Sequence, residues 1–102
     1  MSVVTVTGAI QAKKEHVDAF RSAFITYTKA CANEPGVLVF NTHEAIDLPG
    51  YFVVYERWAS KEVFEEHMQG KLLADFIAAT GEFIEHAEDP RFLTPLAEAV
   101  AR

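Results

Sequence analysis

Two apolar segments joined by a short turn sequence constrain the fold of this chain more than any other feature. Residues 37–46 and 51–58 are rich in Val, Phe and Tyr, and residues 47–50 between them read Asp-Leu-Pro-Gly. Because proline and glycine favour a tight connection, we expect the two segments to form an antiparallel hairpin. The hairpin also carries polar side chains, and polar groups buried in a sheet need hydrogen-bond partners or a ligand.

The segment before the hairpin predicts one strand and one long helix. Residues 3–11 present apolar or small side chains on two alternating faces, which is typical of a strand. From Lys14 to Asn33, apolar residues recur at three- and four-residue steps and define one face of an amphipathic helix. Pro35 and Gly36 end this helix, because proline cannot continue it and glycine permits a turn.

The segment after the hairpin predicts two helices and a final strand. Ser60 is suited to cap a short helix that stops at Gly70. Residues 71–86 carry the spacing of a third helix. Residues 91–96 predict a last strand at an edge of the sheet, and residues 97–102 are expected to form a tail.

The order of these elements is that of the ferredoxin-like split βαβ unit. In this α+β architecture, a four-stranded antiparallel sheet carries its helices on one face. A chain of 102 residues is enough for a single domain over residues 1–102. The second face of the predicted sheet is also rich in Val, Leu, Phe and Tyr and would stay exposed in a monomer. We therefore expect a homodimer whose two sheets pack face to face, a dimeric α/β barrel.

Charge and cysteine content exclude several kinds of partner. The formal net charge is -6 and no basic cluster is present, which argues against binding to nucleic acid or to an anionic membrane. No apolar run could span a bilayer and the N-terminus lacks a signal-peptide pattern, so a cytoplasmic location is expected. The single cysteine, Cys31, falls on the apolar stripe of the first helix, which indicates a packed thiol. Metal-ligand spacings are missing, so neither a metal nor another cofactor is expected.

The register of the hairpin decides which side chains share a face of the sheet. Pairing Ile46 with Tyr51 places Asn41 opposite Glu56. Because side chains alternate with period two, Trp58 then lies on the same face. We therefore expect these polar and aromatic groups to lie together on one face.

The short helix adds a histidine to this group. Phe64, His67 and Met68 lie on one side of the helix at steps of three and four residues, so the imidazole is expected to face the sheet. Phe52 on the hairpin and Phe76 on the third helix supply further aromatic walls. Together these residues predict an aromatic pocket.

Four short motifs resemble the antibiotic biosynthesis monooxygenase family and its quinol monooxygenase relatives. They are Glu34-Pro35-Gly36 before a strand, Glu56-Arg57-Trp58 at the end of a strand, the helix start Ser60-Lys61-Glu62, and His67. The resemblance covers nearly the whole chain and implies a dimeric ferredoxin-like barrel with a ligand pocket between sheet and helices. Members include cofactor-independent oxygenases of polycyclic phenols and quinols, haem-degrading enzymes, and an isomerase of a phosphorylated quorum-sensing sugar derivative.

The haem-degrading branch does not fit this sequence. Its members carry an asparagine on the first strand, a tryptophan on the short helix and a histidine on the next helix. The matching region here offers Thr7 or Gly8, then His67, and then Ile77. The resemblance therefore implies a pocket without haem.

The leading functional hypothesis is a cofactor-independent monooxygenase that acts on a small quinol or phenol with molecular oxygen. An electron-rich quinol reacts with dioxygen without metal or flavin if the enzyme stabilises its deprotonated form and keeps it dry. In this hypothesis His67 accepts a proton, Asn41 orients an oxygen and Glu56 fixes a neighbouring polar group. Trp58 and Phe76 hold the aromatic ring between them, and Phe52 and Phe64 complete the substrate pocket.

Each of these residues also has a structural interpretation. His67 can tie the short helix to the sheet, and Glu56 can make a structural hydrogen bond or ion pair. Trp58 can serve as a core residue, and Asn41 can satisfy backbone groups at an irregular strand.

Two other functional classes stay open. One is an isomerase of a small phosphorylated hydroxyketone, for which only Arg57, Lys71 and Arg91 are candidate phosphate ligands. The other is a small-ligand-binding stress module without turnover. Product formation without oxygen would indicate the isomerase, and saturable binding without product would indicate the binding module.

Overall fold

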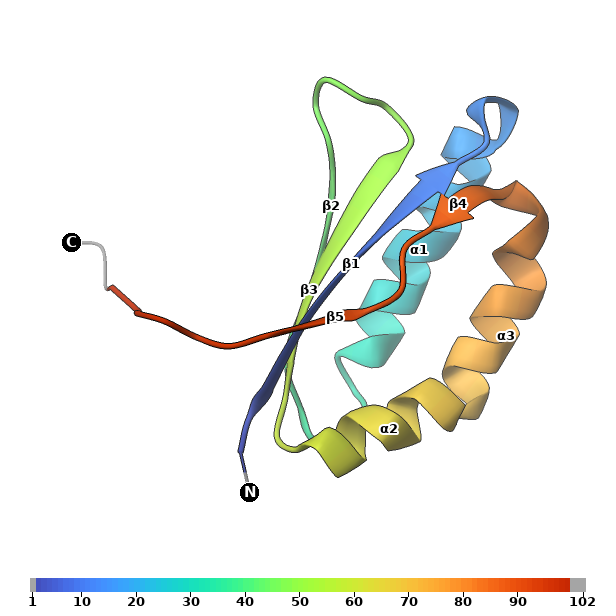
Figure 1. Ribbon diagram of the computed structural model, residues 1–102. Helices are drawn as coiled ribbons and strands as arrows, with labels where there is room; N and C mark the ends of the chain where they lie inside the picture. The colour runs from blue at the N-terminus through green and yellow to red at the C-terminus, as the bar shows by residue number, and fades with distance from the viewer. Residues whose placement is uncertain (1, 100–102) are drawn as a thin grey trace.

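The sheet is built around the first strand of the chain. The computed structural model describes residues 2–99 and shows a five-stranded antiparallel sheet in the order β2-β3-β1-β4, with β5 also paired to β1 (Figure 1). The strands are β1 (Val4–Ala12), β2 (Val37–Glu44), β3 (Tyr51–Trp58), β4 (Ile84–Ala87) and β5 (Arg91–Leu93). The helices are α1 (Val17–Cys31), α2 (Lys61–Gln69) and α3 (Lys71–Thr80), with 3-10 turns η1 (Lys14–His16) and η2 (Gly81–Phe83).

The arrangement of layers confirms the predicted α+β ferredoxin-like fold. All three α-helices cover one face of the sheet, and the segment after β5 extends away from the opposite face (Figure 1). The predicted last strand is present as β5, and a further short strand, β4, lies mostly within the range predicted as the end of the third helix. Both β4 and β5 pair with the same edge of β1. None of the described helices combines the length and apolar character that crossing a membrane would require.

Aromatic rings fill the space between the helices and the sheet. Phe20 and Phe24 project from α1, Phe52 from β3 and Phe76 from α3. Neighbouring ring centroids in this group lie 5.1 to 5.9 Å apart. Burying one such side chain stabilises a fold by roughly 1.5–3 kcal/mol. The aromatic cluster therefore fixes the position of α1 and α3 over the sheet.

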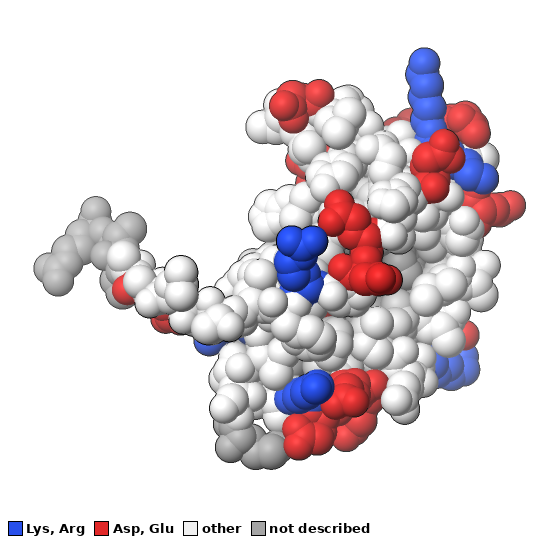
Figure 2. Space-filling view, in the orientation of Figure 1, with Lys and Arg blue, Asp and Glu red and all other residues white. Residues whose placement is uncertain are grey.

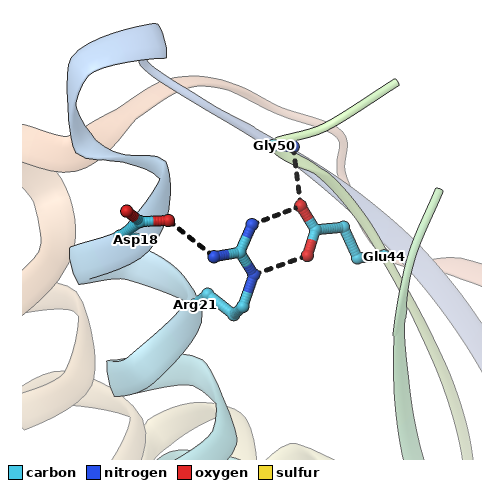
Figure 3. Close-up of polar contacts among 4 residues, drawn as sticks. All are labelled: Asp18, Arg21, Glu44 and Gly50. Carbon is cyan, nitrogen blue, oxygen red and sulfur yellow. Dashed lines mark hydrogen bonds and ion pairs between the residues drawn. The ribbon is translucent and has the colours of Figure 1, made fainter. Parts of the chain in front are cut away.

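A cluster of charged groups fastens α1 to the hairpin (Figure 3). The Arg21 guanidinium donates two hydrogen bonds to Glu44, of 2.6 and 2.9 Å, and a third of 2.7 Å to Asp18. Glu44 also accepts a hydrogen bond of 2.9 Å from the backbone N–H of Gly50. Gly50 has a φ of 90° in the β2–β3 connection, a region that favours glycine. The cluster therefore joins the start of α1 to both ends of that connection.

The predicted hairpin register is wrong by one residue. Asn41 pairs with Tyr55 and Phe40 pairs with Glu56, so the predicted opposition of Asn41 and Glu56 does not occur. The strand β2 also has an irregularity between Val37 and Val39. The observed register buries Phe40 against the helices and leaves Asn41 exposed on the other face. Burying phenylalanine instead of an unpartnered amide is the favourable choice, since a slip of one residue exchanges the two faces.

The third helix is shorter than predicted. It ends at Thr80, and the chain continues through η2 into β4, whereas the sequence pattern predicts helix as far as His86. Gly81 lowers helix propensity at this point. The backbone of β1 near Ile10 also needs a hydrogen-bonding neighbour, which β4 supplies.

The last strand is also shorter than the predicted range 91–96, since β5 ends at Leu93. Residues 97–99 of the predicted tail carry no helix or strand. Residues 100–102 lie outside the described part of the chain.

We predict that Glu44→Gln makes stability less dependent on pH in acid. Hydrogen bonds from Arg21 and Gly50 lower the pKa of the Glu44 carboxyl from 4.5 to about 2. The stabilisation from this group is therefore fully present above pH 4.5 and is lost as the pH falls toward 2. At neutral pH the thermal midpoint, measured by circular dichroism, should be higher for the wild type than for the variant. This difference should disappear in acid. Glu65→Gln, at an exposed position of α2, is the control, and a constant gap across the range would contradict the prediction.

Candidate functional site

A largely apolar cavity of about 290 Å³ lies between the inner face of the sheet and the helices α2 and α3. Its walls include the rings of Phe24, Tyr27, Phe40 and Phe76. Glu88 and Pro90, from the connection between β4 and β5, also line it, as do further residues of β1, α3 and β4. The cavity therefore occupies the position that the sequence predicts for a ligand pocket.

The imidazole of His67 is held from two sides. His67 is 5% exposed and projects from α2 into the cavity wall. Its Nδ1 is hydrogen-bonded to the carboxylate of Glu34, which belongs to the turn after α1. Its Nε2 lies 3.2 Å from the hydroxyl oxygen of Tyr27 on α1. The Trp58 ring packs against the imidazole with centroids 4.6 Å apart. Contacts from α1, from the turn after it and from β3 thus fix a side chain that α2 carries.

Glu56 is the second ionisable group of the cavity interior. It lies on β3, is 8% exposed, and accepts a hydrogen bond of 2.9 Å from Nε1 of Trp58. Burial raises the pKa of the Glu56 carboxyl, and the bond from Trp58 and the nearby His67 oppose this shift. Glu56 therefore retains its proton to a higher pH than an exposed glutamate does. In that form it can donate a hydrogen bond to a ligand oxygen.

The structure brings only some of the predicted site residues together. His67, Glu56 and Phe76 line the cavity. Trp58 lies behind the imidazole, where it is fully buried and does not line the cavity. Asn41 lies on the opposite face of the sheet because of the changed register, so its predicted position in the pocket is wrong.

Two predicted aromatic wall residues are core residues that do not line the cavity. Phe52 packs against Phe24 with centroids 5.7 Å apart. Phe64 packs against Trp58 and Phe92. Both are almost fully buried. They therefore support the cavity wall from behind.

The two hydrogen-bond partners of His67 are absent from the predicted site. Glu34 belongs to the Glu34-Pro35-Gly36 motif, which signals family membership but no role. Tyr27 falls on the apolar stripe of α1, and a tyrosine at such a position is predicted to be a core residue. The available signal was the polar end of Tyr27, because a buried hydroxyl needs a partner.

One group of side chains has the composition of a metal site. Cys31, Glu34 and His67 offer ligand atoms that lie within 4.8 Å of one another. However, Glu34 and His67 are already hydrogen-bonded to each other. Burial raises the pKa of the Cys31 thiol to about 12, which disfavours the thiolate that binds metals. The group therefore fits a hydrogen-bonded pair beside a neutral thiol better than a metal centre.

The charges around the cavity disfavour anionic ligands. No Lys or Arg is among the described residues that line it. Figure 2 shows acidic side chains gathered beside a hollow over the connection between β4 and β5, with a basic side chain next to them. This connection contains Glu88 and Asp89 and is followed by Arg91. Inside the cavity an anion would meet Glu56 and Glu88, and no Lys or Arg of the described lining would compensate the negative charge. A neutral ligand fits the cavity better.

Comparison with known proteins identifies related sequences and folds. The family model described as Antibiotic biosynthesis monooxygenase matches residues 3–79. The structure of Rv0793 from Mycobacterium tuberculosis is 24% identical, with a TM-score of 0.84 over 97% of this chain and 100% of that chain. PA3566 from Pseudomonas aeruginosa is 18% identical, with a TM-score of 0.86 over 95% of this chain and 97% of that chain. No curated protein gives a significant match. These structural similarities show the fold.

We predict that Gly8→Leu blocks the cavity while the fold is retained. Gly8 lies on the cavity side of β1, and a Cβ there would meet only Val54 Cγ1, at 3.4 Å, so a longer side chain would enter the cavity. Binding of 1-naphthol, measured by fluorescence titration, should weaken about tenfold or more, because blocking even a methylene-sized space changes binding by about 1–3 kcal/mol. Gly81→Leu is the control, since a Cβ at Gly81 meets nothing within 4 Å. Unchanged binding by the Gly8 variant would contradict the assignment of the cavity.

Proposed function

The chain belongs to the antibiotic biosynthesis monooxygenase family, and from this premise we propose that it oxidises a small neutral quinol or phenol with molecular oxygen. The reaction needs neither a metal nor an organic cofactor. The observation that carries the proposal is a buried histidine, fixed by two hydrogen bonds, in the wall of an aromatic cavity that has no cationic side chain in its described lining.

The chemistry begins with removal of a proton from the substrate hydroxyl. His67 is the acceptor, and an imidazole suits this role because its unperturbed pKa, about 6.5, lies near physiological pH. When the Glu56 carboxyl carries a proton, which burial favours, it donates a hydrogen bond to a substrate oxygen and stabilises the negative charge that develops there. The apolar cavity keeps the anion away from water.

The deprotonated quinol then supplies the electrons for the reaction with dioxygen. One oxygen atom of O2 replaces a ring hydrogen, and the other leaves as water. The quinol becomes a hydroxyquinone, so no external reductant is consumed. The side chains therefore need only to bind, deprotonate and shield the ring.

The size of the cavity supports a substrate with one or two rings. Its volume of about 290 Å³ is just below the range of about 300–1,000 Å³ that is usual for ligand pockets, which favours a small ligand. Tyr27 and Phe76 stack on each other with centroids 4.1 Å apart, and both belong to the wall of the cavity. A planar aromatic ring can pack against this wall.

Isomerisation of a phosphorylated hydroxyketone has less support. The three candidate phosphate ligands lie away from the cavity lining. Arg57 lies on the outer face of β3, and Lys71 is exposed and paired with Asp75 at 2.5 Å. Arg91 borders a neighbouring hollow of about 240 Å³ that shares lining residues with the cavity, but Arg91 does not line the cavity itself. A phosphate in the cavity would therefore find no Lys or Arg among the described lining residues.

The proposal includes a homodimer formed through the outer face of the sheet. That face exposes Val53, Tyr55 and Leu93, each more than a third accessible. Residues 94–99 extend from the same side of the sheet (Figure 1). A second copy packed there would cover both the apolar face and the extended segment.

His67→Ala is expected to lower the turnover number by about 10²–10⁴-fold, the usual contribution of a general base. The measurement is oxygen uptake by the purified protein with a panel of one- and two-ring quinols, with mass spectrometry of products formed in ¹⁸O2. His86→Ala, at an exposed position of β4, is the control. A turnover number of the His67 variant equal to that of the wild type would contradict the role of His67 as general base. Binding without product from any quinol would favour a non-catalytic module.

Val53→Glu is expected to convert the dimer to a monomer, because it places a charge in the apolar outer face of the sheet. Sedimentation velocity measures the change. Ile46→Glu introduces the same charge at a fully exposed position after β2 and serves as the control. A wild-type protein that sediments as a monomer would contradict the proposed assembly.

A further inference from the structure

His67 separates two hollows of different character. On one side is the aromatic cavity, and on the other is a smaller outer hollow of about 160 Å³. The outer hollow is lined by Glu34, Pro35, Trp58, Val63, Glu66 and His67. Among the described residues, His67 alone lines both spaces. The imidazole therefore lies between the cavity and the outer hollow and contacts both.

The two ring nitrogens of His67 have different partners. Nδ1 is bonded to the Glu34 carboxylate, which can only accept, so Nδ1 carries a proton. In the neutral ring, Nε2 then has a free lone pair. Burial raises the pKa of Tyr27 well above its usual range, so its hydroxyl stays protonated and donates to Nε2. The contacts thus set one direction, from Tyr27 through His67 to Glu34.

We propose that Tyr27, His67 and Glu34 form a proton relay that carries the substrate proton out of the cavity into the outer hollow. This inference rests on the proposed function, since it concerns the deprotonation step. Tyr27 lines the cavity and Glu34 does not, while the Glu34 side chain is 24% exposed. One end of the chain of hydrogen bonds therefore faces the ligand, and the other end faces solvent.

Each step moves a proton and no electron. The substrate O–H bond breaks, and its proton passes to the Tyr27 oxygen as the Tyr27 hydroxyl gives its own proton to Nε2 of His67. Nδ1 then releases its proton to the Glu34 carboxylate. Glu34 passes this proton to water in the outer hollow, which leaves the imidazole neutral with its remaining proton on Nε2. The net change of this outward transfer is one substrate anion in the cavity and one proton in solvent. The starting form of the ring is restored when the reduced oxygen in the cavity takes the Nε2 proton through Tyr27 and water supplies a proton to Nδ1 through Glu34.

A relay of this kind solves a specific difficulty of the site. Water that entered the cavity to remove the proton would also solvate the anion and slow its reaction with oxygen. A route through the wall removes the proton without admitting water. Trp58, packed against the imidazole at 4.6 Å, helps to keep the ring in the orientation that joins the two sides.

Glu34→Gln separates the relay from a structural role. The amide oxygen of glutamine can still accept the Nδ1–H hydrogen bond and hold α2 in place, but the amide cannot take up the proton. The variant should keep the thermal midpoint and KM of the wild type, while kcat falls about 10- to 100-fold, within the range of proton-transfer effects. Glu66→Gln is the matched control, because Glu66 lines the same outer hollow. Wild-type kcat in Glu34→Gln would overturn the relay.

Tyr27→Phe tests the cavity end of the relay. It removes only the hydroxyl and keeps the ring that stacks on Phe76. We expect a loss of kcat of similar size with KM unchanged. Unchanged kcat would mean that the substrate proton reaches His67 directly, which overturns the part assigned to Tyr27.

A measurement without substrate keeps this inference distinct from the proposed function. The exchange rate of the His67 ring N–H with water can be measured by ¹H–¹⁵N NMR in the ligand-free protein. The relay predicts slower exchange in Glu34→Gln than in wild type and no change in Glu66→Gln. Equal exchange in all three proteins overturns the relay, whether or not any quinol is oxidised. Slower exchange with no oxygen uptake supports the relay while the proposed oxidation fails.

Discussion

The hydrogen bonds of one buried imidazole organise the whole site. A histidine side chain can be buried among aromatic rings only if both ring nitrogens find partners, since an unpaired buried polar group costs about 1–3 kcal/mol. Glu34 and Tyr27 meet this requirement from the turn after α1 and from α1 itself. The same contacts orient the ring toward the cavity. The same two bonds therefore contribute both to the stability of the fold and to the orientation of the imidazole in the site.

The aromatic core and the cavity are parts of one structure. Phe76 belongs to the cluster that holds α3 over the sheet, and it also stacks on Tyr27 to form a cavity wall. Trp58 is fully buried, yet it donates to Glu56 and packs on His67. These residues transmit the rigidity of the core to the polar groups. A preorganised site of this kind loses little free energy to reorganisation when charge develops on a ligand.

The fold was predictable from the sequence because its signals are local. The period of the first helix, the cap at Ser60 and the turn before β3 are all present in the structure. The hairpin register was not predictable, because it is set at the connection before β3, where the N–H of Ala45, and not Ile46, is hydrogen-bonded to Tyr51. Glu56 and His67 were found as polar groups within apolar segments. Glu34 and Tyr27 were missed because their roles arise from contacts 33 and 40 residues along the chain from His67.

The interruption between β4 and β5 has a consequence for how molecules reach the interior. These strands contain only four and three residues, and most of their side chains are exposed. The connection between them contributes Glu88 and Pro90 to the cavity lining. Short, exposed segments open at a small fraction of the free energy needed to unfold a whole domain. Local opening of this edge of the sheet would let a ligand enter the cavity while the helices and the central strands stay in place.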